Sequence, residues 1–209
     1  MLIKGDEVAD ILNKHGINVR GVLHIGAHEL EERPFYNNTL NVVDDDIVWV
    51  DANPELVSKA TSSGHKNVYC GAISADEKEL DFKISNNGQS SSLLDFGLHK
   101  QHYPWIHYVN TIKVKTETLG SFFNRNNLDG RKYNFWNLDI QGVEYDVLRS
   151  ATEFFAQVDA IYTEINTAEV YKGCGLLNEI DDLLTSYGFT RIRTEMTGAQ
   201  WGDALYIKG

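Results

Sequence analysis

The sequence predicts an α/β fold in which a mostly parallel sheet is covered by helices on both faces. Two observations predict it: short runs of strand-forming residues alternate with longer helical patterns, and their spacing is that of β–α–β units. Such units are right-handed and place helices on both sides of a parallel sheet. The length of 209 residues, 42% of them hydrophobic, indicates a single domain over 1–209.

Each expected element has its own local signal. Five runs are rich in strand formers and too short for a free helix; they cover 21–27, 47–52, 67–73, 134–140 and 160–166. Helical patterns cover 4–15, 29–36, 54–63, 143–155 and 176–187. Asn53 followed by Pro54 indicates an N-cap, and Gly188 ends the last helix. The remaining 190–196 and 203–208 predict a hairpin that makes the last strands partly antiparallel.

The stretch from about 80 to 123 departs from this rhythm. It contains two expected strands separated by the tract GQSSSLL and the aromatic, histidine-rich HKQHYPWIHY. Forty-odd residues exceed the usual crossover between parallel strands, so we expect an insertion over one end of the sheet. In open α/β folds that end is where ligands bind.

Charge and composition exclude several classes of function. Lys plus Arg number 19 against 30 for Asp plus Glu, and the net charge of −11 repels nucleic acid and anionic lipid. No segment is apolar enough to span a membrane, and the first residues lack a signal-peptide pattern, so we expect a cytoplasmic protein. Cys70 and Cys174 form no C-x-x-C pair, which gives no basis for a disulfide framework or a thiolate zinc site, and no metal ligand set is predicted.

The ends of the first two strands carry the main binding signal. Gly26 and Ala27 allow a ligand close to the backbone, and the helix expected behind them offers free N–H groups. The spacing is not G-x-G-x-x-G, which argues against a dinucleotide. Asp51, 25 residues after Gly26, is placed to bind both hydroxyls of a ribose. The alternative is that Asp51 only caps the turn before Asn53.

Two later strands end in carboxylates at the same edge. Asp139 and Glu164 facing one crevice can position a cationic ligand, accept a proton or hold a divalent ion, and the sequence does not choose among these. Glu144 lies in the first turn of an expected helix, where a negative charge is favourable in itself. His24 and His28 are four apart but straddle a strand end, so His24 is expected to be a core or pocket residue.

The insertion supplies candidate acceptor-binding residues. Aromatic faces beside polar groups suit the apolar faces of sugars, although packing of a surface insertion is the more common role of such a cluster. The serine tract is either a flexible loop or a set of donors at a pocket mouth. The candidates are Ser91, Ser92, His102, Tyr103 and Trp105.

Taken together, the motifs resemble the FkbM family of S-adenosylmethionine-dependent methyltransferases over residues 22–208. The resemblance rests on VLHIGAHELEE, VWVDANPEL, NVYCGAIS, NNGQSSSL, VKTETLGSFF and WNLDIQGVEYDVLRSA, and on the closing hairpin. It implies the Rossmann-like class I methyltransferase fold, with a seven-stranded, mostly parallel sheet and an antiparallel last strand. Three residues depart from the family pattern: His24 stands where relatives commonly have an acid, His28 replaces a small or amide residue, and Gln141 replaces an acid before a glycine.

The resemblance also implies a cofactor site for S-adenosylmethionine. Gly26 and Ala27 are expected to flank its methionyl part, with His24 beside them, and Asp139 to become the partner of its ammonium group. Asp51 is expected to bind the ribose hydroxyls. Ala72 and Ile73 are expected to lie beside the adenine.

The implied reaction is methyl transfer to a hydroxyl, with a sugar of a glycan or glycoconjugate preferred and a small natural product as the alternative. Asp139 or Glu164 is the expected proton acceptor or acceptor-positioning group, and His28 is a weaker candidate. Two other classes stay open: a nicotinamide-dependent oxidoreductase, disfavoured by the missing glycine motif, and a non-catalytic glycan-binding module. A further hypothesis is that the chain is one domain of a larger protein that also carries a glycosyltransferase.

Overall fold

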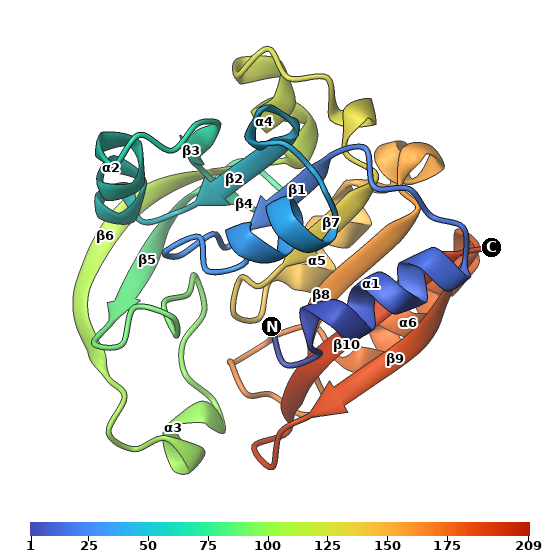
Figure 1. The fold of residues 1–209 in the computed structure, drawn as a ribbon. Helices are drawn as coiled ribbons and strands as arrows, with labels where there is room; N and C mark the ends of the chain where they lie inside the picture. Colours follow the sequence, from blue (N-terminus) through green and yellow to red (C-terminus); the bar gives the residue numbers. More distant parts are fainter.

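The computed structural model describes residues 1–209 and contains a seven-stranded sheet with helices on both faces (Figure 1). In chain order its strands are β1 Val22–Ile25, β2 Ile47–Asp51, β3 Val68–Cys70, β7 Phe135–Leu138, β8 Ala160–Asn166, β9 Phe189–Met196 and β10 Trp201–Lys208. The spatial order is β3-β2-β1-β7-β8-β10-β9. In this spatial order, neighbouring strands are parallel from β3 through β2, β1 and β7 to β8. Strand β10 runs antiparallel to both its neighbours. The predicted fold class is therefore confirmed.

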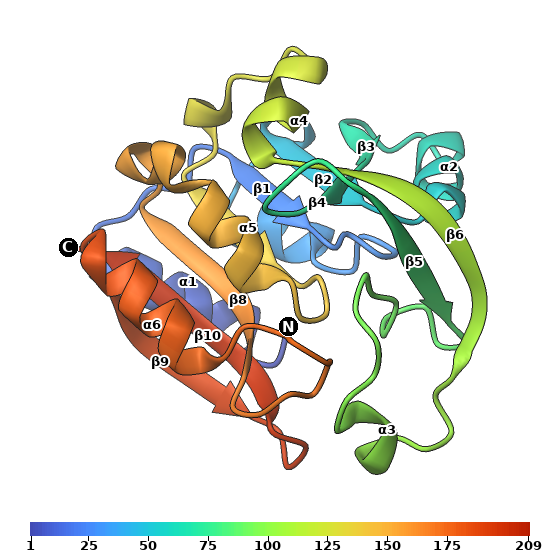
Figure 2. The same ribbon diagram turned by 180° about the vertical axis from the view of Figure 1, so that it is seen from behind.

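Two groups of helices bury the two faces of this sheet. The helices are α1 Gly5–Lys14, α2 Pro54–Ser62, α3 His99–His102, α4 Leu119–Arg125, α5 Glu144–Ser150 and α6 Leu177–Ser186. One core cluster joins α1 and α2 to one face of the sheet, and the larger cluster joins α4, α5 and α6 to the other (Figures 1 and 2). The Asn53 side chain accepts from the amide of Glu55, so the predicted N-cap of α2 is present. No helix is both long and apolar enough to cross a bilayer.

The helix predicted over 29–36 is wrong. His28 and Leu30 have φ values of 42° and 63°, in the left-handed region that a right-handed helix excludes. Helical backbone begins only at Arg33 and leads into a π-helix, Phe35–Thr39. The turn after β1 therefore offers no row of free helical amides, and the ligand-binding helix N-terminus expected behind Gly26 does not exist.

The strand predicted over 67–73 divides at Gly71. Its second half, β4 Ala72–Ile73, leaves the main sheet and pairs with β6 Tyr108–Glu117, which also pairs with β5 Glu79–Ser85. In Figure 1 this three-stranded sheet forms the curved green arm beside α2 and β3, with α3 at its far end. Two strands of this sheet, β5 and β6, coincide with the expected insertion, whereas β4 precedes it.

The strand order changes direction between the parallel strands β1 and β7, and a crevice is expected at their carboxyl ends. From β1 the chain builds outward through β2 and β3, whereas from β7 it builds outward through β8. Ligands of open α/β sheets bind where the strand order reverses, at the carboxyl ends. Gly26, at φ 93°, closes β1 so tightly that an added Cβ would lie 1.8 Å from the carbonyl oxygen of Asp139. Only glycine fits there.

Candidate functional site

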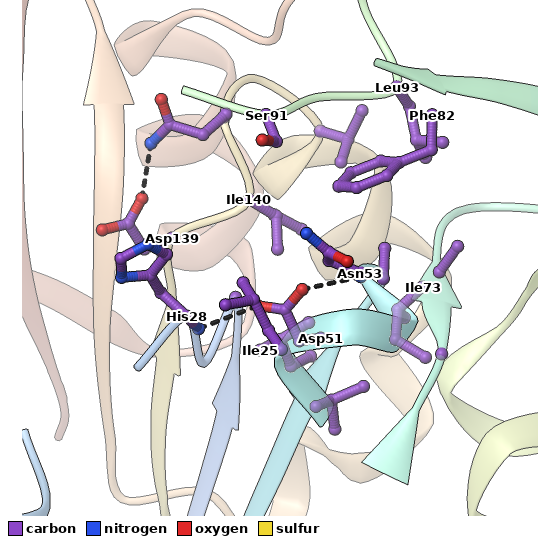
Figure 3. Close-up of a pocket in the computed structure, with 18 of the residues that line it drawn as sticks. Ile25, His28, Asp51, Asn53, Ile73, Phe82, Ser91, Leu93, Asp139 and Ile140 are labelled. Carbon is purple, nitrogen blue, oxygen red and sulfur yellow. Dashed lines mark hydrogen bonds between the residues drawn. The ribbon is translucent and has the colours of Figure 1, made fainter. Parts of the chain in front are cut away.

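A first cavity, of about 580 Å³ with its open mouth included, lies at the carboxyl ends of β1, β2 and β7. Ligand pockets of this size, mostly apolar with a few polar groups, are typical of small-molecule sites. Figure 3 shows Ile73, Phe82 and Leu93 gathered on one side and His28 and Asp139 on the other. The cavity therefore has an apolar end and a polar end.

Asp51 lies between these two ends, at the carboxyl end of β2 (Figure 3). Its two carboxylate oxygens accept hydrogen bonds of 2.8 Å from the amide of His28 and 2.7 Å from the amide of Asn53. Burial raises the pKa of Asp51, and these two amide bonds oppose that rise. Each oxygen keeps one lone pair for a ligand hydroxyl, so Asp51 serves the turn and the cavity together.

A second, larger cavity of about 1,310 Å³, open to solvent, adjoins the first. Five carboxylic acids line it and no lysine or arginine does: Glu31, Glu32, Asp139, Glu164 and Asp203. The Met1 ammonium lies 3.3 Å from Glu32, and Nδ1 of His28 lies 2.7 Å from Glu31. The two cavities share a boundary, to which Gly26, His28, Gln89, Asp139 and Gln141 contribute.

One amide side chain joins the two predicted carboxylates. Nε2 of Gln141 donates to Oδ1 of Asp139 at 2.6 Å and to Oε2 of Glu164 at 2.7 Å. The hydroxyl of Tyr171 donates to Oε1 of the same amide. The structure thus brings Asp139 and Glu164 into one network, as their positions at one sheet edge predict.

The two carboxyl groups differ in their electrostatic surroundings. Asp139 lines both cavities, and desolvation followed by the charge of Asp203 raises its pKa to about 6. Glu164 is buried, and desolvation followed by the charge of Asp139 raises its pKa well above the usual range. With its pKa of about 6, Asp139 is the carboxyl group of the pair that ionises by neutral pH, whereas burial opposes ionisation of Glu164.

Glu144 stabilises a turn and does not face either cavity. It is buried, and it accepts from the amides of Ile140 and Gly142 at 2.8 and 2.9 Å. Desolvation raises its pKa to about 8. Glu144 therefore holds the turn that follows β7 and lines neither cavity.

Two predicted cofactor residues lie away from the first cavity. His24 is buried, and its Nδ1 forms a 3.0 Å hydrogen bond with the hydroxyl of Tyr36. Of the two cavities, it lines only the second. Burial lowers its pKa. Ala27 packs into the core cluster beneath the sheet and lines neither cavity. The other predicted cofactor residues line the first cavity: Gly26, Asp51, Ala72, Ile73 and Asp139.

The candidate acceptor residues of the insertion separate in the structure. Tyr103 lines the second cavity, and Ser91 lines only the first. Ser92 is fully buried, and its hydroxyl donates to the carbonyl of Gln141 at 2.7 Å. His102 and Trp105 line neither cavity, and Trp105 is 66% exposed. The spacing of an insertion does not show which of its side chains face inward.

Several lining residues were not predicted. In the first cavity these are Phe82, Leu93 and Gln89, and in the second they are Gln141, Tyr171 and Asp203. Only Gln141 carried a sequence signal, since it stands where the family pattern has an acid. The others come from strands and loops far apart in the chain, and only the topology brings them together.

A model of the methyltransferase FkbM domain matches residues 24–191. The chain belongs to the FkbM methyltransferase family. It is thus assigned to an S-adenosylmethionine-dependent methyltransferase family, as the sequence motifs indicated. Among curated proteins it is similar to 2-O-methyltransferase NoeI of Sinorhizobium fredii strain NGR234, with 30% identity over 123 residues, 56% of this chain and 50% of that protein. The chain spans about half the length of this relative.

Solved structures agree on the fold. A methyltransferase FkbM from Methylobacillus flagellatus KT matches with a TM-score of 0.53 and 10% identity, over 91% of this chain and 44% of that one. Magnesium protoporphyrin IX methyltransferase of Synechocystis PCC 6803, solved with bound S-adenosylmethionine, matches with a TM-score of 0.51 and 12% identity, over 98% of this chain and 78% of that one. At such identities the likeness shows the fold alone.

Proposed function

We propose that this domain transfers a methyl group from S-adenosylmethionine to a hydroxyl group of a sugar. The observation that carries the proposal is the shared boundary of the two cavities, because a donor in the first and an acceptor in the second would meet there. Asp139, ionised at neutral pH, lines both cavities at this boundary.

The first cavity fits the cofactor by the chemistry of its walls. The apolar end, with Ile73, Phe82 and Leu93, suits an adenine ring, and Asp51 is the acceptor for ribose hydroxyls. When bound, the cofactor supplies an electrophilic methyl group on a sulfonium. The acidic polar end of the cavity suits that positive charge.

Asp139 is the proposed proton acceptor. A hydroxyl becomes a better nucleophile when a nearby base takes its proton, and a base works best when its pKa lies near the working pH. Asp139 meets both conditions, whereas Glu164, which lines the second cavity and accepts from the same Gln141 amide, is placed to position the acceptor. His28, at the same boundary, is bonded to Glu31 through Nδ1.

The second cavity favours an uncharged, hydroxyl-rich acceptor. Aromatic rings at its wall offer flat faces to a sugar, among them Tyr103 and Trp201, which are joined by a 3.1 Å hydrogen bond from the indole to the hydroxyl. The lining carboxylates, with no lysine or arginine, repel phosphate, sulfate and uronate groups. The family and the 2-O-methyltransferase relative support methylation at oxygen.

The test is incubation with S-adenosylmethionine labelled in its methyl group and a panel of acceptors. The panel contains neutral glycans, their phosphorylated or uronic counterparts, and small natural-product alcohols. We expect label to enter neutral glycans and to stay on them through base treatment, as a methyl ether does and a methyl ester does not. Label entering only the small alcohols would reject the sugar acceptor, and binding of glycans without binding of the cofactor would indicate a non-catalytic module.

A further inference from the structure

Gln141 occupies an unusual position between the two carboxylates of the site. The nitrogen of its side-chain amide donates to Asp139 and Glu164 at 2.6 and 2.7 Å. An amide nitrogen has two hydrogens, so both bonds form at once. No other side chain donates a hydrogen bond to Asp139, so its hydrogen-bonded position depends on this residue.

Two contacts and the backbone conformation hold this residue in place. Its backbone adopts φ 58°, its carbonyl accepts from Ser92, and its side-chain oxygen accepts from the hydroxyl of Tyr171. An ionised Asp139 can only accept, so the amide nitrogen faces Asp139 and the amide oxygen faces the Tyr171 hydroxyl. An acid at this position would face Asp139 and Glu164 with a third carboxyl group.

We propose that Gln141 is a positioning residue that holds Asp139 and Glu164 as a fixed pair and keeps Asp139 free to accept the proton of the sugar hydroxyl. The inference rests on the proposed function. Gln141 touches neither the methyl donor's sulfur nor the acceptor oxygen in this role; it acts through the two carboxyl groups.

The neighbouring charged groups cannot replace it. Asp203 is bonded to the hydroxyl of Tyr162 and the amide of Leu2, and Glu144 is bonded to backbone amides. The carboxylates of Asp203 and Glu32 repel the negative charge of Asp139 and so oppose its ionised form. The ionisable groups that face the pair from other elements are Glu32, Glu144, Asp203, Tyr162, Tyr171, His28 and the Met1 ammonium.

Two substitutions test the role of the donor. Gln141→Glu keeps the shape and removes the donor, and Gln141→Leu removes all polarity. For both we expect kcat to fall by about tenfold at pH 7 and the acid limb of kcat/KM to move up by about one pH unit, while the affinity for demethylated cofactor stays within about twofold. Gln200→Leu is the matched control: Gln200 is exposed, has φ 65° and lines neither cavity. We expect it to behave as wild type.

Tyr171→Phe provides a second variant if the Gln141 variants unfold, because it frees the amide without removing it. It should move the acid limb the same way by a smaller amount. An unchanged pH profile in a folded Gln141→Glu or Tyr171→Phe enzyme would overturn the inference, as would equal losses in Gln200→Leu.

The failure of the proposed function has a separate signature. The titration of Asp139 can be followed by carboxyl carbon NMR, with its signal identified from Asp139→Asn, in the absence of any acceptor. If no glycan is methylated but the midpoint of Asp139 rises in Gln141→Glu, the positioning role stands and the reaction must be reassigned. If methylation occurs and the midpoint does not move, the positioning role is wrong.

Discussion

The two cavities differ in how they are built. The first takes His28, Asp51 and Asp139 from the ends of β1, β2 and β7, each close to a motif that can be found locally in the sequence, and it takes Gln89 and Ser91 from the insertion. The second takes its lining from the turn after β1, the insertion, β8 and β10, which lie up to more than a hundred residues apart in the chain. The proposed cofactor cavity is therefore marked mainly by short motifs, whereas the proposed acceptor cavity depends on the assembled topology.

The largest expected effect separates chemistry from binding. Asp139→Asn removes the proposed proton acceptor and keeps the shape of the side chain, so we expect kcat to fall by about 10³-fold. Affinity for S-adenosylmethionine, measured by calorimetry, should change by less than about fivefold. Equal losses of turnover and affinity would instead give Asp139 the ammonium-binding role that the family resemblance implies.

The next effect belongs to the first cavity. Asp51→Ala removes the acceptor for the ribose hydroxyls, and we expect the Kd for S-adenosylmethionine to rise by about 30-fold, or ~2 kcal/mol. The kcat at saturating cofactor should stay within about threefold, and KM for the glycan should not change. Calorimetry with an unchanged Kd would leave Asp51 only its bonds to the amides of His28 and Asn53.

Acidification should affect the shared boundary. The pKa of Asp139 is raised to about 6, and the carboxylate form is the active one, so activity is full above that pH and is lost below it. We expect kcat/KM to fall about tenfold for each pH unit below about 6. A profile that stays flat to pH 5 would require another base.

The smallest effect compares two aromatic residues of the insertion. Tyr103 lines the second cavity, whereas Trp105 lines neither cavity, although the two rings pack edge to face at 5.8 Å. We expect Tyr103→Ala to raise KM for the glycan about fivefold and Trp105→Ala to change it less than twofold. The reverse order, in steady-state kinetics with the same acceptor, would extend the acceptor site onto the exposed surface.

The sequence could predict the sheet because each strand is marked by its own residues. Runs such as 47–52 and 160–166 are rich in strand formers, and Asn53 with Pro54 marks a helix start. The helix over 29–36 was predicted in error because the preference of its residues for helix is overridden by the turn at His28, whose amide is bonded to Asp51.

The candidate site was predictable in part for the same reason. Asp139 and Glu164 come together because both end parallel strands, a relation that follows from the fold class alone. Ser92, His102 and Trp105 were predicted to bind the acceptor from their residue types, but inward or outward orientation depends on tertiary contacts. Gln141 became significant only when its amide was found between two carboxyl groups.

The position of strand β10 in the sheet bears on how this domain folds during synthesis. It is the last strand in the chain, yet it lies between β8 and β9 and brings Asp203 to the second cavity. Until residues 201–208 have left the ribosome, β9 has no partner in the sheet and the second cavity lacks the wall that β10 supplies. The first cavity takes no lining residue beyond Val143, so all of its lining is synthesised before that of the second is complete.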